Sequence, residues 1–141
     1  MDSPFPPILL VPLPGRRYRT LRHILAQWEI LEAATATLAV EILNSCPVGV
    51  VICDAEIEGG DWQALLSSLQ DRPAPPNVII SSRLADERLW AEVLNLGGYD
   101  VLAQPFDEAE VRRVVHMAWT AWKRRGEGRD TSTPQRIAAS A

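Results

Sequence analysis

The stretch that decides the fold is VGVVICDAEIEGG, which spans Val48 to Gly60. It is apolar from Val50 to Cys53 and then runs directly into the carboxylate of Asp54, after which the loop contains two adjacent glycines. A short continuous apolar run bounded by turn residues is typical of a strand that is buried on both faces. We therefore predict a central strand over 48–53, with an acid at its carboxyl end.

The same rhythm of apolar runs and helix-like segments extends along most of the chain. Further strands are predicted at 8–11, 29–33, 78–80 and 101–103. Between them, apolar residues recur at helical spacing, for example at Leu21, Ile24, Leu25 and Trp28. Five alternating strand–helix pairs predict an α/β fold, in which a five-stranded parallel sheet is covered by helices on both faces.

Several polar residues and glycines mark where helices begin and end. Asp61, Asp86 and Asp107 stand before apolar helical patterns, as N-caps do, and Glu110 completes a capping box with Asp107. Gly97 and its neighbour Gly98 suit a left-handed helix end.

Composition excludes several classes of function. The chain has 141 residues, a net charge of -4 and 47% hydrophobic residues, which suits one globular domain and gives no electrostatic case for nucleic-acid binding. The basic residues between Arg16 and Arg22 are interpreted as a solvated helix face. Cys46 and Cys53 lack metal-ligand spacing and fit a reducing cytoplasm, with Cys53 in the core. No signal peptide and no membrane-spanning run is recognisable.

We expect three segments. Residues 1–7 form an N-terminal extension, residues 8–123 form the domain, and the polar residues 124–141 form a flexible tail. Because so few residues follow Trp122, we expect a stand-alone module without an output domain.

Two motifs in this setting make the sequence resemble the receiver domains of bacterial response regulators, the CheY-like, flavodoxin-like (βα)5 three-layer sandwich. DAEIEGGDW, from Asp54 to Trp62, is similar to the family pattern Asp-x-x-Met-Pro-Gly-x-Asp-Gly. ADERLWAEVLNLGGYDVLAQPFD, from Ala85 to Asp107, is similar to a helix followed by Gly-Ala-x-Asp-Tyr-Leu-x-Lys-Pro-Phe. The resemblance covers about 8–122.

The resemblance implies a phosphorelay switch rather than an enzyme. It implies that Asp54 accepts a phosphoryl group from a histidine kinase, that Ser82 donates a hydrogen bond to that group, and that a cis bond precedes Pro105. It also implies an acidic pair after the first strand, which holds Mg²⁺ together with the aspartate, and a lysine before Pro105. Phosphoryl transfer needs such charges because it depends on positioning and charge neutralisation.

The sequence departs from this pattern at several chemical positions. Pro12 and Leu13 stand where the acidic pair is expected, and Gln104 stands at the lysine position. Val101 replaces the aromatic switch residue. Asp54, with Glu56 through its backbone or side chain, is left as a weak Mg²⁺ site if there is one.

Two interpretations of the function remain open, and a third, an unrelated flavodoxin-like enzyme or nucleotide binder, is disfavoured because no cofactor loop is present. In the first, the chain is an atypical receiver that Asp54 phosphorylation switches. In the second, it is a pseudo-receiver, a protein-binding or dimerisation module in which Asp54 accepts backbone N–H groups from Gly59 and Gly60. Ser82 either contacts phosphate or caps the turn that follows it. His23 and His116 are interpreted as surface residues.

The resemblance also implies where partners bind. The expected partners are a histidine kinase or another signalling protein, and a homodimer through the fourth helix, fifth strand and fifth helix. Neither nucleic acid nor a membrane is expected. That stretch contains Trp90, Tyr99, Trp119 and Trp122, of which we expect Trp119 in the core and Trp90 or Trp122 partly exposed.

Overall fold

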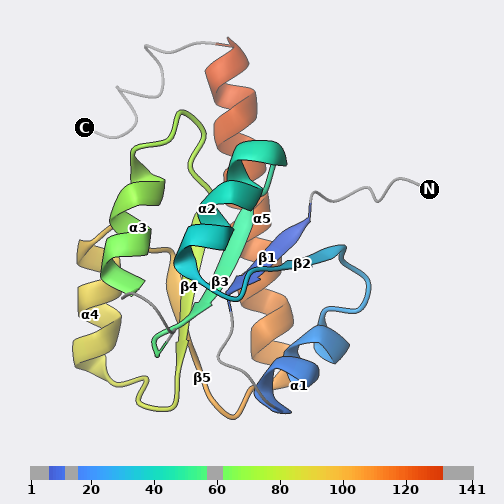
Figure 1. Cartoon of the computed structure of the whole chain (residues 1–141), viewed down its shortest axis with the longest axis vertical. Coiled ribbons are helices and arrows are strands. Elements are labelled where there is room, and N and C mark those ends of the chain that lie inside the picture. The colour runs from blue at the N-terminus through green and yellow to red at the C-terminus, as the bar shows by residue number, and fades with distance from the viewer. Residues whose placement is uncertain (1–6, 12–15, 57–61, 132–141) are drawn as a thin grey trace.

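The computed structural model describes residues 7–11, 16–56 and 62–131. Within these ranges strands and helices alternate along the whole chain, as the sequence predicts (Figure 1). The strands are β1 (Ile8–Val11), β2 (Ile30–Glu32), β3 (Val50–Asp54), β4 (Asn77–Ser82) and β5 (Asp100–Ala103). The helices are α1 (Arg16–Ile24), α2 (Ala36–Ser45), α3 (Trp62–Gln70), α4 (Glu87–Asn95) and α5 (Glu108–Thr131).

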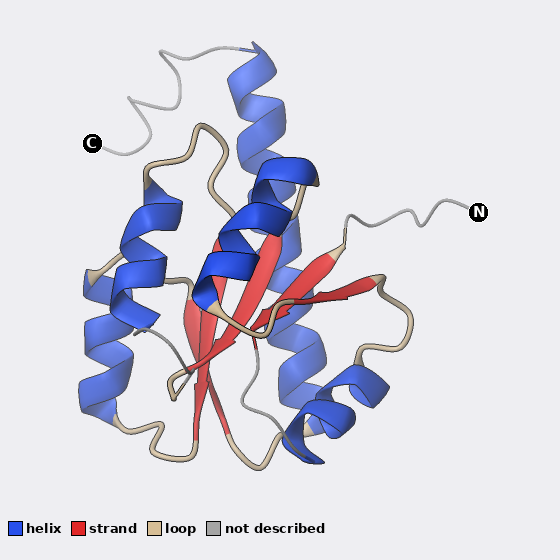
Figure 2. Ribbon diagram, in the orientation of Figure 1, coloured by secondary structure: helices blue, strands red, loops and turns tan. Residues whose placement is uncertain are grey.

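The five strands form one parallel sheet in the order β2-β1-β3-β4-β5 (Figure 2). One face of the sheet packs against α1 and α5, and the other packs against α2, α3 and α4. The predicted α/β class, with its three layers and five parallel strands, is therefore confirmed. β3 lies in the middle of the sheet, and every residue of β3 is buried.

The alternation of side chains along the strands decides which groups meet at the carboxyl edge. In β3, Val50 and Ile52 join the core on the α1 and α5 side, whereas Val51 and Cys53 join the core on the opposite side. Successive side chains of a strand point to opposite faces. Asp54 therefore continues the series of Val50 and Ile52 and belongs to the α1 and α5 face.

The predicted caps at Asp86 and Asp107 are confirmed, whereas α1 ends at Ile24, before Leu25 and Trp28 of its predicted apolar series. The Asp86 side chain accepts the Leu89 N–H at 2.9 Å, and the Asp107 side chain accepts the Glu110 N–H at 2.9 Å. Gly97 has φ of 96°, a left-handed conformation that strains any residue with a Cβ. Asp61, the third predicted cap, lies outside the described residues.

The last helix differs from the expectation, because α5 continues past Lys123 to Thr131. Contacts to the start of β4 support this extension. Arg125 donates to the Pro75 carbonyl and to Asn77 Oδ1, both at 3.0 Å, and Asn77 donates to the Ala118 carbonyl at 2.7 Å. The domain boundary predicted at residue 123 therefore falls inside α5. The contacts of Arg125 join residues that are distant in sequence, and a pattern of apolar residues does not reveal such contacts.

The tryptophans lie as predicted. Trp119 is 9% exposed and meets Trp28 edge-to-face, with ring centroids 6.0 Å apart. Trp90 is 50% exposed, and Trp122 is half-buried. Within the described ranges, every helix is too short or too polar to cross a bilayer.

The close approach of Trp122 to Gly49 generates a stability prediction. A Cβ added at Gly49 would lie 2.8 Å from the Trp122 ring, so we expect Gly49→Ala to destabilise the fold by about 1–3 kcal/mol. Gly126→Ala is the matched control, because no atom lies within 4 Å of its added Cβ and alanine favours the helix by about 0.5–1 kcal/mol. Urea unfolding of both variants measures the difference, and an unchanged midpoint for Gly49→Ala would contradict the packing.

Candidate functional site

Three polar side chains meet at the carboxyl edge of the sheet. Among the described residues, the buried polar or charged ones are Asp54, Ser81 and Gln104. Asp54 ends β3 and is paired in register with Ser81 of β4, and Gln104 directly follows β5. Each of the three lies two residues after a core residue on the α1 and α5 face of the sheet. Side chains two residues apart on a strand point to the same face, so the three side chains lie on one face of the sheet edge.

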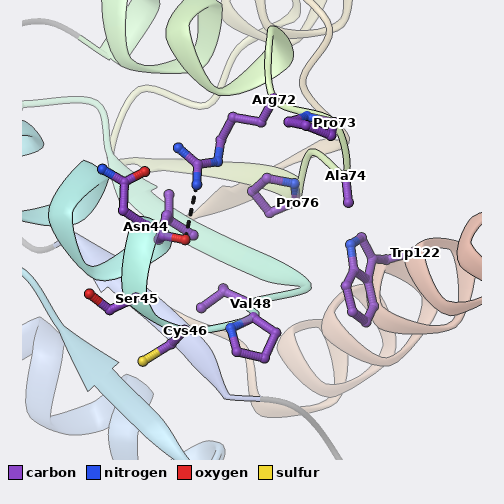
Figure 3. Close-up of a pocket in the computed structure, with 11 residues that line it drawn as sticks. Asn44, Ser45, Cys46, Val48, Arg72, Pro73, Ala74, Pro76 and Trp122 are labelled. Carbon is purple, nitrogen blue, oxygen red and sulfur yellow. Dashed lines mark hydrogen bonds between the residues drawn. The ribbon is translucent and has the colours of Figure 1, made fainter.

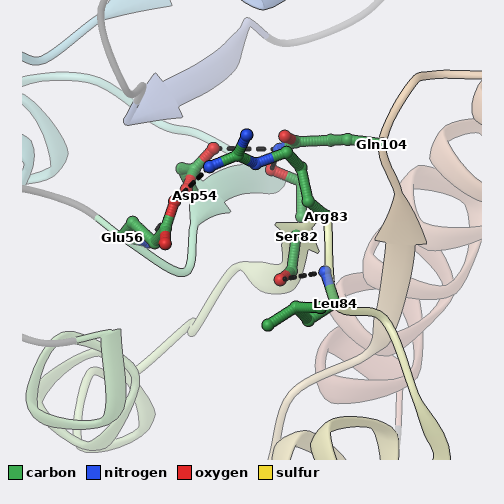
Figure 4. A network of polar contacts seen from close by, with 7 residues as sticks. Asp54, Glu56, Ser82, Arg83, Leu84 and Gln104 are labelled. Atoms are coloured by element: carbon green, nitrogen blue, oxygen red, sulfur yellow. Dashed lines mark hydrogen bonds and ion pairs between the residues drawn. The ribbon is translucent and has the colours of Figure 1, made fainter.

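The Gln104 amide joins the other two groups, and Figure 4 shows its contact with Asp54. Gln104 Nε2 donates to Asp54 Oδ2 at 2.9 Å and to Ser81 Oγ at 3.1 Å. Gln104 Oε1 is buried and accepts no hydrogen bond. The residue at the lysine position of the family thus reaches the aspartate, but it does so with a neutral amide.

The other oxygen of Asp54 is held by the backbone. Its Oδ1 accepts the Glu56 N–H at 2.8 Å, a short-range turn of the kind that aspartate favours. The Glu56 carboxylate itself is exposed and lies 4.0 Å from Arg83 Nη2. The predicted donors Gly59 and Gly60 lie outside the described residues.

The two serines at the end of β4 occupy different environments. Ser82 Oγ accepts the Leu84 N–H at 3.0 Å, which is the local turn contact that the sequence left as one of two possibilities. Ser81, which sequence reasoning did not select, is the serine whose hydroxyl reaches Gln104. The register Asp54–Ser81 explains this, because residues paired on adjacent strands point to the same face. Two-residue steps along the sequence place Ser81 on the same face as Ile79, but the strand register is needed to show that Asp54 shares this face.

The remaining predicted positions lie as follows. The Gln104–Pro105 bond is cis, as the resemblance implied. His23 and His116 are exposed. Pro12 and Leu13 lie outside the described residues.

The weak Mg²⁺ site expected at Asp54 and Glu56 stays a prediction. Within the described ranges, no group of three His, Cys, Asp or Glu side chains is placed to hold a metal ion. Both carboxylate oxygens of Asp54 already accept N–H groups, and the Glu56 carboxylate faces Arg83. Mg²⁺ keeps several water ligands and is usually bound through one or two carboxylates, so Asp54 and Glu56 are the described acids through which such a site would form.

Cys53 lies beside the site but takes no part in it. Its side chain is fully buried on the opposite face of β3, and Sγ is 3.4 Å from the Asp54 carbonyl. Burial, with a smaller contribution from the Asp54 charge, raises the pKa of the Cys53 thiol to about 12. The thiol therefore stays protonated and unreactive at neutral pH.

Comparison with known proteins shows the family of this chain. The model of the response regulator receiver domain matches residues 17–116, which is more than half of the chain. A search of curated proteins gave no match.

Solved structures agree with the family model. The receiver domain of an HD domain-containing protein from Pseudomonas fluorescens aligns with a TM-score of 0.75 and 28% identity, covering 84% of this chain and 98% of that one. The receiver domain of Francisella response regulator 1452 aligns with a TM-score of 0.72 and 22% sequence identity, and the alignment covers 82% of this chain and 98% of that one. A CheY-like receiver domain protein from Methanospirillum hungatei aligns with a TM-score of 0.74 and 16% sequence identity, and the alignment covers 86% of this chain and 98% of that one.

The contact between Gln104 and Asp54 can be tested by a double-mutant cycle. We expect Gln104→Met to destabilise the fold by about 1–3 kcal/mol, because it removes a donor from a buried carboxylate. In combination with Asp54→Ala, much of this loss should disappear, leaving a coupling energy above about 0.5 kcal/mol in urea unfolding. Glu56→Gln, at an exposed side chain, is the control and should change little. Strict additivity of the two substitutions would show that the contact contributes nothing.

The buried Cys53 thiol predicts a pH dependence of stability. Its pKa rises from 9.0 to about 12 on folding, so the folded state holds the proton more tightly than the unfolded state. The contribution is fully present below pH 9 and is lost as pH rises from 9 towards 12. Wild type should therefore lose more unfolding free energy than Cys53→Ala between pH 8 and pH 10.5. Parallel pH profiles of the two proteins would be inconsistent with the raised pKa.

Proposed function

Because the chain belongs to the response regulator receiver family, we propose that it is an atypical receiver of two-component signalling, in which Asp54 is a poor phosphoacceptor and signalling depends on protein contact. The observation that carries this proposal is the Gln104 amide 2.9 Å from Asp54 Oδ2, where the resemblance calls for an ammonium. A neutral amide can orient the carboxylate, but it supplies no charge to a transferring phosphoryl group.

The expected loss of transition-state stabilisation supports slow phosphorylation of Asp54. Removing one preorganised donor from a transition state typically reduces a rate by a factor of about 10²–10³. Here the lysine is replaced by Gln104, and Pro12 and Leu13 stand in place of the metal-binding acids. The two losses together remove most of the charge that makes an aspartate react with a phosphoryl donor.

The proposed output is a contact with another signalling protein, a histidine kinase or a second copy, in the cytoplasm. The face that the resemblance implies for such contacts lies on α4, β5 and α5. There Trp90 is 50% exposed and lines a hollow of about 250 Å³ with Val101 and Glu110. A valine in place of the aromatic switch residue leaves no ring to move when Asp54 is modified, so this face is expected to be permanently competent for binding.

A direct test compares wild type with a variant that regains the family's charges. Pro12→Asp, Leu13→Asp and Gln104→Lys are combined, and both proteins are incubated with Mg²⁺ and acetyl phosphate. We expect the combined variant to form an aspartyl phosphate at least about 100-fold faster than wild type, as measured by intact mass spectrometry over time.

Asp54→Asn added to the combined variant is the control and should abolish the product. Circular dichroism and urea unfolding verify that each variant is folded. Phosphorylation of wild type within about tenfold of the combined variant would overturn the proposal and leave the alternative, a receiver that Asp54 phosphorylation switches in the usual way.

A further inference from the structure

A cavity of about 420 Å³ lies at the amino edge of the sheet, the edge opposite Asp54 (Figure 3). Three segments that are distant in sequence form it: the turn between α2 and β3, the loop between α3 and β4, and the second half of α5. The lining residues that matter for recognition are Asn44, Val48, Arg72, Pro73, Pro76 and Trp122. Among the described residues that line it, none has an acidic side chain.

The Trp122 ring lines one side of the cavity. The Trp122 ring packs so closely on Gly49 that a Cβ there would lie 2.8 Å from it, so one side of the ring is supported by backbone. The pyrrolidine rings of Pro73 and Pro76 line the cavity as well. Such rigid apolar walls suit a planar ring, which can stack without loss of side-chain freedom.

Two side chains of the cavity, Arg72 and Trp122, have N–H groups relevant to recognition. The half-buried Arg72 donates from Nη2 to the Leu43 carbonyl at 3.0 Å, and it forms no ion pair with any described residue. The Trp122 indole N–H is buried and has no acceptor.

Arg72 also has a structural role, which uses only part of the hydrogen-bonding capacity of its guanidinium group. The Leu43 carbonyl belongs to the last turn of α2, where carbonyl groups lack helical partners, so the contact caps that helix. It uses one of the five N–H groups of the guanidinium. The carboxyl ends of α2 and α3 both lie at this edge of the sheet, and their partial negative charge disfavours a multiply charged anion.

From these features we propose that the cavity is a binding site for a small planar ring that carries oxo or carboxylate acceptors and no more than one negative charge. The ring stacks on Trp122, and its acceptors meet the free N–H groups of Arg72. Guanine has this chemistry because its O6 and N7 atoms match an arginine fork, and so does an aromatic carboxylate. This site is independent of phosphorylation at Asp54.

The test uses guanosine and benzoate as separate probes, titrated into the full chain labelled with ¹⁵N. The five tryptophans each give an indole N–H signal, and Trp122→Phe assigns the one from Trp122. We expect at least one probe to shift this signal saturably below about 5 mM, with smaller shifts for the other indoles. Saturation by guanosine alone identifies a neutral oxo ring as the ligand, and saturation by benzoate alone identifies a carboxylate.

Two variants separate recognition from folding. Arg72→Gln should weaken binding at least about tenfold, because a charge-assisted hydrogen bond is lost. Ala74→Phe, at an exposed residue of the lining, should block the cavity while leaving Arg72 in place. Arg88→Gln, on the exposed surface of α4, is the matched control and should bind as wild type does. No saturable shift with either probe, or equal binding by Arg72→Gln and wild type, would overturn the proposal.

Discussion

The hydrogen bond from the Gln104 amide to the buried Asp54 carboxylate is the contact on which the interpretation of this molecule depends. Burying a carboxylate is costly unless hydrogen bonds replace its lost hydration. Gln104 Nε2 at 2.9 Å and the Glu56 N–H at 2.8 Å supply two such bonds from neutral groups. The edge of the sheet can therefore hold the acid in place by hydrogen bonds from neutral donors.

The parallel sheet is what makes this contact possible. Asp54, Ser81 and Gln104 come from positions far apart in the sequence, yet each follows an apolar residue on the same face of its strand. Parallel strands bring their carboxyl ends to one edge, and the two-residue alternation decides which side chains converge there. The same rule places Ser82 on the other side, where its hydroxyl stabilises the turn to Leu84.

The sequence was sufficient for features that depend on local patterns and insufficient for those that depend on long-range polar contacts. The strands, the caps at Asp86 and Asp107, and the buried Trp119 follow from periodicity and turn chemistry. The choice of Ser81 required the strand register, which apolar patterns leave ambiguous by one residue. The continuation of α5 to Thr131 could not be predicted, because a polar helix end without apolar spacing resembles a tail.

A switch needs two states that differ in free energy, and a modification can shift them only through contacts that change. In the described structure, Gln104 already contacts Asp54 and Ser81, so the amide is engaged before any phosphoryl group arrives. The helix that follows is also anchored at its far end, where Arg125 holds the start of β4. The proposed function therefore expects phosphorylation to have only a small differential free energy available, given the neutral contact at one edge and the anchored helix at the other. Under the proposed function, these two contacts would hold the domain in one conformation, which is what binding a partner without phosphorylation requires.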